Sequence, residues 1–425
     1  MVYTFVAFKH EYLGALDEVK AGESYRMNMV RISGIKGNPY AGWLYWGVPF
    51  GIGADNNANG VGSNLLILRD NTVEETEDGP VFVSKVKDVE LASGMKADGI
   101  VVNKKHLVSN ENGAYAVYIS RANCMSGLMN QFTLQKVNGL EAEEVAYDYT
   151  IQGQVDLLVE GKYVYVVGGS NTDTINKTKN YLHEELGKAI LDVWVYDTEA
   201  ETFMGYTKHV PFTQAGKDYS YLTSAVEDGV VYSAFISADE KTIEVFSFDQ
   251  ETKKWNSTST VQSLEAAPEK LAAYCEEGVF DIIYTNDGAL YSSHDGKLID
   301  GEVGNIFPVS GGVGMVFQDD EAVYFLDTTG FAAVPDIAPA DYVWGLSNAS
   351  GGVVFTASAS APFEFKAYDA ATGNLLGTYL MDKYIAPADT PEIVSDGTNY
   401  TLFVLGDKHG VGTWYYGCTA ISVNE

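Results

Sequence analysis

The sequence predicts an all-β fold built from one repeated strand unit, and three observations support this prediction. A glycine followed within about two to five residues by an aromatic residue recurs along the chain. Short alternating strands are joined by Asp-led turns, while helical periodicity is almost absent. The 425 residues include 43 Gly but only 11 Pro, as expected for a fold with many tight turns.

The glycine and aromatic anchors set the size of the repeat. Eight anchors span 355 residues in seven steps, which gives a mean step near 51 residues. The steps vary from 24 to 71 residues, so the repeats have diverged. Gly278 competes with the neighbouring anchors, and merging two units there would leave seven. The anchors are Gly42, Gly113, Gly161, Gly229, Gly288, Gly312, Gly352 and Gly397.

Three units carry a hairpin signal in addition to the anchor. An aromatic residue is followed, after six residues that contain an Asp-led turn, by an apolar or aromatic residue. This spacing predicts a β-hairpin whose two flanking side chains lie on one face. The pairs are Tyr196 with Phe203, Phe248 with Trp255, and Tyr368 with Leu375. One short helix is expected in an insertion at residues 181–188.

Repeats of about 50 residues with three or four antiparallel strands are typical of propeller blades. We therefore predict a single closed β-propeller domain over residues 1–425, with eight blades or, alternatively, seven. The last unit is one strand short, and residues 3–8 are expected to supply that strand and close the ring. Another sandwich or barrel of similar size is the competing fold.

The units around residues 165 and 248 resemble the kelch family. Gly168 and Gly169 form a double glycine after Tyr165, and the pairs at Tyr196 and Phe248 have the spacing of the kelch aromatic pair. The resemblance is clear in the third unit, partial in the fourth and seventh, and elsewhere limited to the anchor. In style alone, the acidic, Arg-poor sequence is similar to secreted or lipid-anchored propellers of Bacteroidota that capture glycans or siderophores.

The charge balance narrows the choice of partners. Subtracting 58 acidic from 27 basic residues leaves −31, and only four of the basic residues are Arg. This balance argues against nucleic acid and against a basic membrane-binding patch. The longest apolar run, residues 2–8, is far too short to span a bilayer. No signal-peptide pattern is present, so we expect any leader to have been removed.

The three cysteines are odd in number and far apart. We expect Cys124, Cys275 and Cys418 to be buried free thiols, because their spacing matches no metal site. These three cysteines can form one disulfide at most.

A calcium-loop pattern occurs near the N-terminus. Asp55, Asn57 and Asn59 place oxygen ligands at loop positions one, three and five, and Gly60 follows at position six. The twelfth position is Leu66, which excludes an EF-hand. We predict weak calcium binding, and the alternative is an ion-free Asn-Gly turn.

Long loops predict a ligand-binding face. They are expected at residues 51–63, 121–131, 170–190 and 407–412, on neighbouring units, where they would rim a concave surface. These segments collect cationic and polar side chains that are scarce elsewhere, which indicates an anionic or polar ligand. The alternative is that these side chains include ordinary surface lysines that are exposed by chance and bind no ligand. The predicted ligand-binding residues are Arg121, Asn123, Lys177, Lys179, His183, Lys408 and His409.

Catalytic motifs are absent from the sequence. The six His fall in different units, and no nucleophile elbow, phosphate loop or dinucleotide fingerprint occurs. Neither the arginine triad of sialidase propellers nor a Tyr–Cys copper-oxidase site can be identified.

These observations lead to one main functional hypothesis and one alternative. The main hypothesis is non-catalytic binding of a small molecule, glycan, siderophore or protein. It places the protein in an extracellular, periplasmic or surface-anchored location, as a monomer or in a surface complex. The alternative is a propeller enzyme, a hydrolase or lyase with carboxylates over the central channel.

Overall fold

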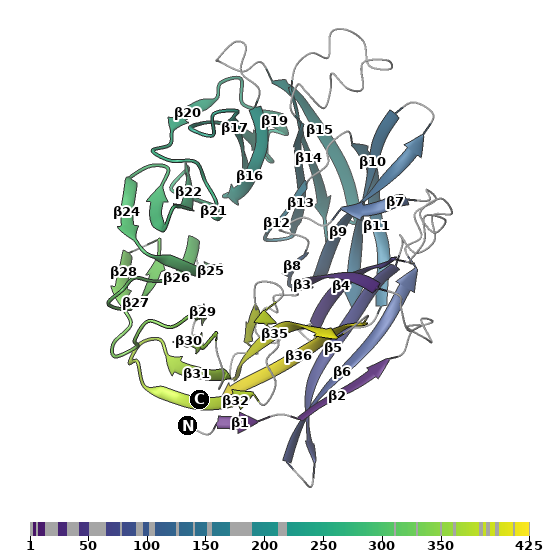
Figure 1. The fold of residues 1–425 in the computed structure, drawn as a ribbon. Helices are drawn as coiled ribbons and strands as arrows, with labels where there is room; N and C mark the ends of the chain where they lie inside the picture. Colours follow the sequence, from purple (N-terminus) through teal and green to yellow (C-terminus); the bar gives the residue numbers. More distant parts are fainter. Residues whose placement is uncertain are drawn as a thin grey trace.

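The computed structural model shows β-strands and turns throughout the part of the chain that it describes (Figure 1). Some of these strands are described by their backbone pairing alone. The expected helix at residues 181–188 lies outside this part. The described residues are 3–5, 7–12, 24–31, 42–50, 65–76, 79–90, 97–101, 107–124, 127–138, 141–150, 155–170, 189–210, 219–309, 312–328, 330–348, 351–359, 363–381, 386–387, 392–395, 399–410 and 413–424.

Four of the sheets share one plan, in which four antiparallel strands follow chain order. The first comprises β12 (Val155–Glu160), β13 (Tyr163–Ser170), β14 (Ala189–Asp197) and β15 (Thr202–Val210). The second comprises β21 (Leu271–Glu276), β22 (Val279–Asn286), β23 (Ala289–Ser292) and β24 (Gly296–Asp300). The third comprises β25 (Glu302–Val309), β26 (Gly312–Gln318), β27 (Val323–Asp327) and β28 (Gly330–Ala333). The fourth comprises β29 (Tyr342–Asn348), β30 (Gly351–Ala357), β31 (Phe363–Asp369) and β32 (Leu375–Met381).

Four further sheets vary this plan by one strand. One comprises β16 (Tyr219–Glu227), β17 (Val230–Ser237), β18 (Thr242–Asp249), β19 (Lys254–Trp255) and β20 (Thr260–Ser263). Another comprises β7 (Ala97–Val101), β8 (Leu107–Asn110), β9 (Gly113–Cys124), β10 (Gly127–Asn138) and β11 (Glu141–Thr150). A third comprises β2 (Ala7–Tyr12), β3 (Ser24–Arg31), β4 (Gly42–Phe50), β5 (Leu65–Thr76) and β6 (Gly79–Glu90). The last comprises β1 (Tyr3–Phe5), β33 (Ala386–Pro387), β34 (Glu392–Ser395), β35 (Asn399–Gly410) and β36 (Thr413–Asn424).

The N-terminal segment divides between the last sheet and the first. β1 pairs antiparallel with β36, as expected from the missing strand of the last unit. β2 instead pairs parallel with β6. The single strand expected at residues 3–8 is therefore two strands, which belong to different sheets.

The three predicted hairpins have the register that their sequence spacing implied. Tyr196 lies opposite Phe203, Phe248 opposite Trp255, and Tyr368 opposite Leu375. At the first turn, Asp197 Oδ1 accepts hydrogen bonds from the N–H groups of Glu199 and Ala200 at 3.0 Å. The aspartate at the start of each turn thus fixes the loop that brings the two side chains together.

One of the predicted anchors is misplaced. Gly161 and Gly229 each precede the second strand of their sheets, with φ of 52° and 74°. Gly278, with φ of 78°, holds the same place before β22, whereas Gly288 precedes the third strand, β23. The left-handed turn at this position favours glycine. Gly278 is therefore the equivalent anchor, and the choice of Gly288 was wrong.

The hydrophobic core lies between neighbouring sheets. Phe132 of β10 packs on Trp194 of β14 with ring centroids 4.5 Å apart. Similar clusters join β17 to β22 and β26 to β30. The first strands of successive sheets also contact one another, as β12 does with β16 and β25 with β29. In Figure 1 these first strands face the inside of a curved row, while β24 and β28 lie outside.

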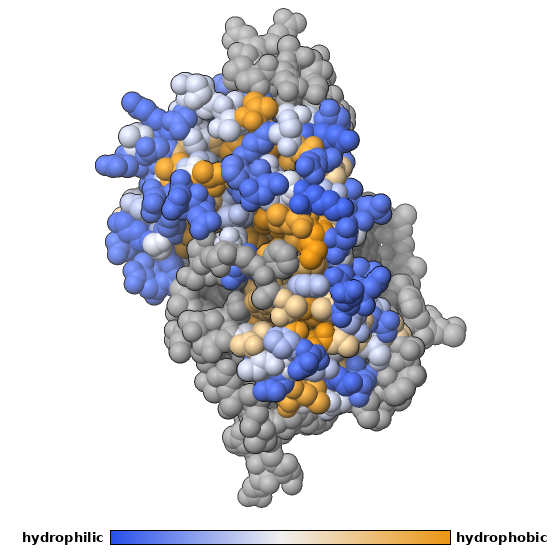
Figure 2. Space-filling view, turned by 90° about the vertical axis from the view of Figure 1, so that its left-hand side faces the viewer, coloured by the Kyte–Doolittle hydropathy of each residue, from blue (hydrophilic) through white to orange (hydrophobic). Residues whose placement is uncertain are grey.

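The outer surface is mixed in character. On the side drawn in Figure 2, hydrophilic side chains cover most of the described surface, with hydrophobic patches between them. Cys275 is a buried free thiol, as predicted for that residue.

Candidate functional site

A pocket of about 520 Å³ lies where the first strands of three successive sheets begin. Three acidic residues from these strand starts line it. Glu269 stands two residues before β21, Glu302 is the first residue of β25, and Asp341 immediately precedes β29. Each acid therefore lies at or just before the start of the first strand of its sheet.

Close approach of two first strands fixes the geometry of the pocket. A Cβ atom at Gly304 would lie 1.7 Å from the carbonyl oxygen of Val343, so only glycine allows this approach. Beside it, the Asn305 amide donates to Gly345 O and accepts from Gly345 N, each at 2.8 Å. These contacts hold β25 and β29 together and set the relative positions of Glu302 and Asp341.

The connection that carries Asp341 is held by a second amide. Gln318 donates to Ala340 O at 2.6 Å and accepts from Ala340 N at 2.9 Å. Asp341 Oδ2 then accepts from the N–H of Ala359 at 2.7 Å. Among the described residues no donor reaches Asp341 Oδ1, so this oxygen is available to a ligand.

The other two acids are also incompletely paired. In the described part of the chain, no donor reaches the exposed carboxylate of Glu302. Glu269 receives one long hydrogen bond, from Asp287 N at 3.3 Å. Among the described residues Lys270 forms no ion pair with these acids, and its ammonium group donates to Val303 O at 2.8 Å. The pocket therefore carries more negative than positive charge.

Two aromatic side chains form one wall of the pocket. Tyr342 and Trp344 stack with centroids 5.6 Å apart and planes 7° from parallel. Trp344 is only 4% exposed. None of the described residues accepts a hydrogen bond from its indole N–H. The wall thus combines a flat apolar surface with one unused donor.

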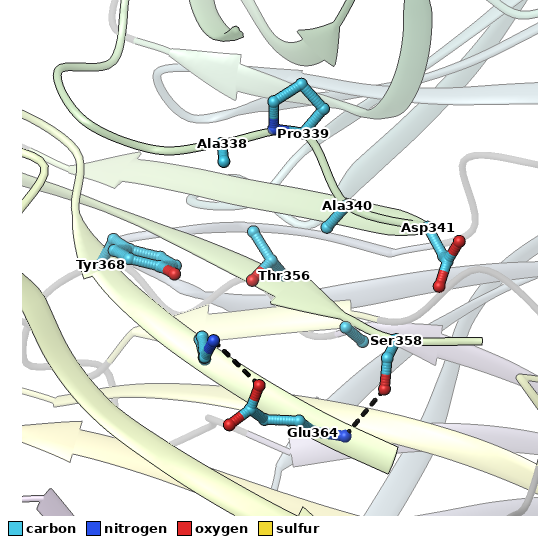
Figure 3. A pocket seen from close by; sticks show the side chains of 10 residues that line it. Ala338, Pro339, Ala340, Asp341, Thr356, Ser358, Glu364 and Tyr368 are labelled. Atoms are coloured by element: carbon cyan, nitrogen blue, oxygen red, sulfur yellow. Dashed lines mark hydrogen bonds and ion pairs between the residues drawn. The ribbon is translucent and has the colours of Figure 1, made fainter. Parts of the chain in front are cut away.

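A second hollow of about 420 Å³ adjoins this pocket and shares Asp341 with it (Figure 3). Lys366 lines the hollow and pairs with Glu364 at 2.8 Å. The hydrogen bond that the Lys366 ammonium group donates to Glu364 raises the pKa of Lys366. Ser358 Oγ accepts from Glu364 N at 2.9 Å, which fixes the strand that carries the pair. The lysine of this hollow is therefore also engaged by the protein.

This arrangement favours acid–base chemistry. Carboxylates with unused oxygens can accept a proton or donate one, and two of them on opposite sides of a bond suffice for its hydrolysis. Within the described ranges, no three His, Cys, Asp or Glu side chains are grouped closely enough to bind a metal ion.

Most of the predicted site residues lie outside the described residues. This is so for the calcium-loop residues Asp55, Asn57 and Asn59, and the calcium site stays a prediction. It is also so for three of the predicted ligand-binding residues, Lys177, Lys179 and His183.

Two of the expected long loops are hairpins of long strands. Arg121 and Asn123 lie on β9, opposite Asn130 and Leu128 of β10. Lys408 and His409 lie on β35, opposite Tyr415 and Trp414 of β36. The expectation of loops at residues 121–131 and 407–412 is therefore wrong, because the strands continue almost to the turns. Ligand binding by these four residues remains a prediction.

The pocket acids were missed because they occupy short connections. Long loops directed attention elsewhere, and 58 acidic residues gave no reason to select these three. One local signal was present, an acid directly before the aromatic residue that opens a first strand. Asp341 before Tyr342 shows it, and so does Asp218 before Tyr219.

Comparison with known proteins gives fold likeness only. No family model matches the sequence, and no curated protein matches it. The Pyrococcus horikoshii acylaminoacyl peptidase is similar at TM-score 0.41 and 11% identity, over 89% of this chain and 58% of the peptidase. This chain thus spans less than two thirds of that enzyme.

Two further solved structures are similar to this chain. An oligogalacturonate lyase in complex with manganese has TM-score 0.43 and 10% identity, over 84% of this chain and 96% of the lyase. The β-propeller domain of the Pyrococcus furiosus Trilobed protease has TM-score 0.38 and 10% identity, over 85% and 98%. Over the residues that the structure describes, the successive antiparallel sheets form a propeller-like, all-strand fold, which is the coarse form of the sequence prediction.

The main functional hypothesis of the sequence analysis requires correction. It favoured a non-catalytic binding protein, whereas the similar structures include a peptidase and a lyase. The enzyme alternative is therefore taken up below as a proposal. The substrates and reactions of those proteins remain theirs, because every TM-score is below 0.5.

In the part of the chain that the structure describes, no helix has the length and apolar character needed to cross a membrane.

Proposed function

We propose that this protein is a propeller enzyme, a hydrolase or lyase, whose carboxylates act at the starts of the first strands. The observation that supports this proposal is the convergence of Glu269, Glu302 and Asp341 on one pocket. Surface acids usually lie apart in solvent or pair with a cation. Here three successive sheets deliver an acid from the same topological position, and a single lysine lines the pocket with them.

Glu302 and Asp341 have the chemical properties that the proposal needs. In hydrolysis, one carboxylate removes a proton from water as the water oxygen attacks, while a second acid protonates the leaving group. In elimination, the same base removes a proton from carbon, and the leaving group departs with a proton from the acid. Glu302 suits the role of base because no described residue occupies its oxygens. Asp341 suits the second role because Ala359 holds its orientation.

The finer fold assignment is part of the proposal. We propose one closed propeller domain over residues 1–425, with each of the eight sheets as a blade and kelch-like repeats. The pairing of β1 with β36 and of β2 with β6 supports closure, because one short segment joins the last sheet to the first. We also propose an extracellular, periplasmic or surface-anchored location and weak calcium binding at Asp55, Asn57 and Asn59.

The proposal is tested by turnover of a panel of polysaccharides, oligosaccharides, peptides and esters. Glu302→Gln and Asp341→Asn should each lower kcat by a factor of about 100 or more, because each removes a proton-transfer group. Glu251→Gln, an exposed acid on the turn after β18, is the matched control and should retain full turnover. Unchanged kcat in both pocket variants would overturn the proposal.

A further inference from the structure

The charge of the pocket selects among carbohydrate and peptide substrates. Three carboxylates line it, and its single lysine donates to a backbone carbonyl. The adjoining hollow adds Glu364 and Lys366, which neutralise each other. An anionic group that entered would meet three carboxylates and only one ammonium group, in a protein of net charge −31. A substrate without acidic groups avoids this repulsion.

The hydrogen-bonding groups of the pocket are mostly acceptors. Asp341 Oδ1 and both oxygens of Glu302 have no donor among the described residues. They would therefore bind groups that donate, such as hydroxyl or ammonium groups. The indole N–H of Trp344 has no acceptor among the described residues, so it can donate to a hydroxyl or ether oxygen.

A sugar ring offers these features together. Its hydroxyl groups donate and accept, its ring oxygen accepts, and its C–H face is apolar. Tyr342, which is partly exposed and stacks on the buried Trp344, supplies an aromatic surface of matching kind. A volume of about 520 Å³ is within the usual range for a small-ligand site, so it suits a short stretch of sugar chain.

We infer that the substrate is a carbohydrate without acidic groups, either neutral or amino-substituted, and that the reaction is hydrolysis of a glycosidic bond. This inference rests on the proposed function of the same pocket. Hydrolysis breaks the bond between the anomeric carbon and the glycosidic oxygen. The oxygen of water bonds to that carbon, its proton passes to a carboxylate, and the leaving oxygen takes a proton from the second acid. Elimination is disfavoured because it uses the acidic protons of uronate sugars, which the pocket charge repels.

Calorimetric binding tests the inference. The probes are neutral cello-, xylo- and manno-oligosaccharides, amino-substituted chitosan oligosaccharides, and acidic oligogalacturonides of equal length. We expect at least one neutral or amino-substituted probe to bind and the acidic probes to bind at least tenfold more weakly. Tighter binding of the acidic probes would overturn the inference, as would the failure of every oligosaccharide to bind at millimolar concentration.

A tryptophan variant locates the binding. Trp344→Phe keeps an aromatic ring but removes the N–H, so it should weaken binding of the neutral sugar about tenfold, as expected for one hydrogen bond. Trp255→Phe is the matched control, because its indole N–H donates to Tyr206 O in a different sheet. The control should bind as the wild type does. Equal affinity of wild type and Trp344→Phe would contradict the inference.

Product analysis separates this inference from the proposed function. Turnover of acidic sugars alone, with unsaturated products, would uphold an enzyme at this pocket and overturn the substrate assignment. Binding of a neutral sugar that depends on Trp344, without turnover of any substrate, would uphold the ligand class and overturn the proposed function.

Discussion

The two ends of the first strands use acidic and amide side chains in opposite ways. At the finishing ends, the last residue of a first strand binds the turn of the next sheet. Glu160, the last residue of β12, accepts from Gly229 N at 2.6 Å. Asn110, the last residue of β8, which pairs with β9 as the first strand β7 does, donates to Gly161 O at 3.1 Å. At the starting ends, Glu302 has no donor among the described residues and Asp341 has one.

Glu227 shows the finishing-end contact most fully. Its two oxygens accept from the N–H groups of Glu277 and Gly278 at 2.9 and 2.8 Å. This contact joins β16 to the turn before β22. It also explains the repeated glycine after an acid in the sequence, because that turn needs glycine and offers its backbone to the previous sheet.

The difference separates structural from functional acids. A carboxylate whose oxygens are occupied by backbone donors contributes to the joint between sheets. One whose oxygens remain unused in a pocket contributes little to folding and is available to a substrate. The following predictions test this distinction, beginning with the largest effect on stability.

Asp156 should be the most important polar residue at a joint between sheets. Its Oδ2 accepts from Ser224 N and Ser224 Oγ at 2.7 and 2.8 Å, and also from Tyr221 and Thr223. Asp156→Ala removes the buried carboxylate oxygen that these donors share, so we expect a loss of about 3 kcal/mol in the free energy of unfolding. Denaturant titration measures it. Asp156→Asn keeps one acceptor and should lose less, and equal stability of all three proteins would contradict the prediction.

Glu227 should have a smaller effect on stability. Glu227→Ala removes both acceptors at a partly exposed joint, so we expect a loss of about 1 to 2 kcal/mol. Glu227→Gln retains one acceptor and should lose about half as much. Thermal and denaturant unfolding check the series. A loss no greater than that of the exposed control Glu251→Gln would show that the joint contributes nothing.

Cys275 should report whether this joint opens. Burial, and then the nearby Glu227 carboxylate, raise the pKa of its thiol to about 12 from a usual value of 9.0. Below pH 9 the thiol stays protonated in both folded and unfolded chains. Above pH 9 only the unfolded chain ionises, so its contribution to stability falls as the pH rises toward 12.

Alkylation followed by peptide mapping measures this thiol directly. At pH 8, Cys275 should react slowly with iodoacetamide in the native protein and rapidly in denaturant, because the thiolate is the nucleophile. Glu227→Ala should speed the native reaction. A native rate equal to that of the denatured chain would contradict the burial of this thiol.

The pocket acids should have the smallest effect on stability. Glu302→Gln and Asp341→Asn should change the free energy of unfolding by no more than about 0.5 kcal/mol, because both residues are exposed and incompletely paired. Denaturant titration at pH 7 provides the measurement. A loss as large as that of Glu227→Ala would mean that these acids are structural.

The sequence predicted the pairing of neighbouring strands better than the features that depend on how whole sheets form. The register of Tyr196 with Phe203 follows from six intervening residues and an Asp-led turn, which are all local. The pairing of β1 with β36 followed from a unit that lacked a strand. Long loops were inferred from polar segments, but β9 and β35 continue through them as twelve-residue strands, because polar side chains do not prevent backbone pairing.

The pocket could not be predicted from the sequence, and the reason is physical. Glu302 and Asp341 are 39 residues apart and belong to different sheets. They line one pocket because Gly304 allows two first strands to approach and Gln318 holds the connection before Asp341. No spacing motif encodes such a meeting, since it depends on the packing of successive sheets.

The most direct test of the account compares Glu302→Gln with Glu227→Gln in both turnover and stability. Each variant replaces one carboxylate by an amide, at opposite ends of the first strands. The account predicts that Glu302→Gln loses turnover of a neutral glycan by a factor of about 100 with stability unchanged. It predicts that Glu227→Gln loses stability and keeps its turnover. The opposite pattern, or equal changes in both variants, would contradict the distinction between the two ends.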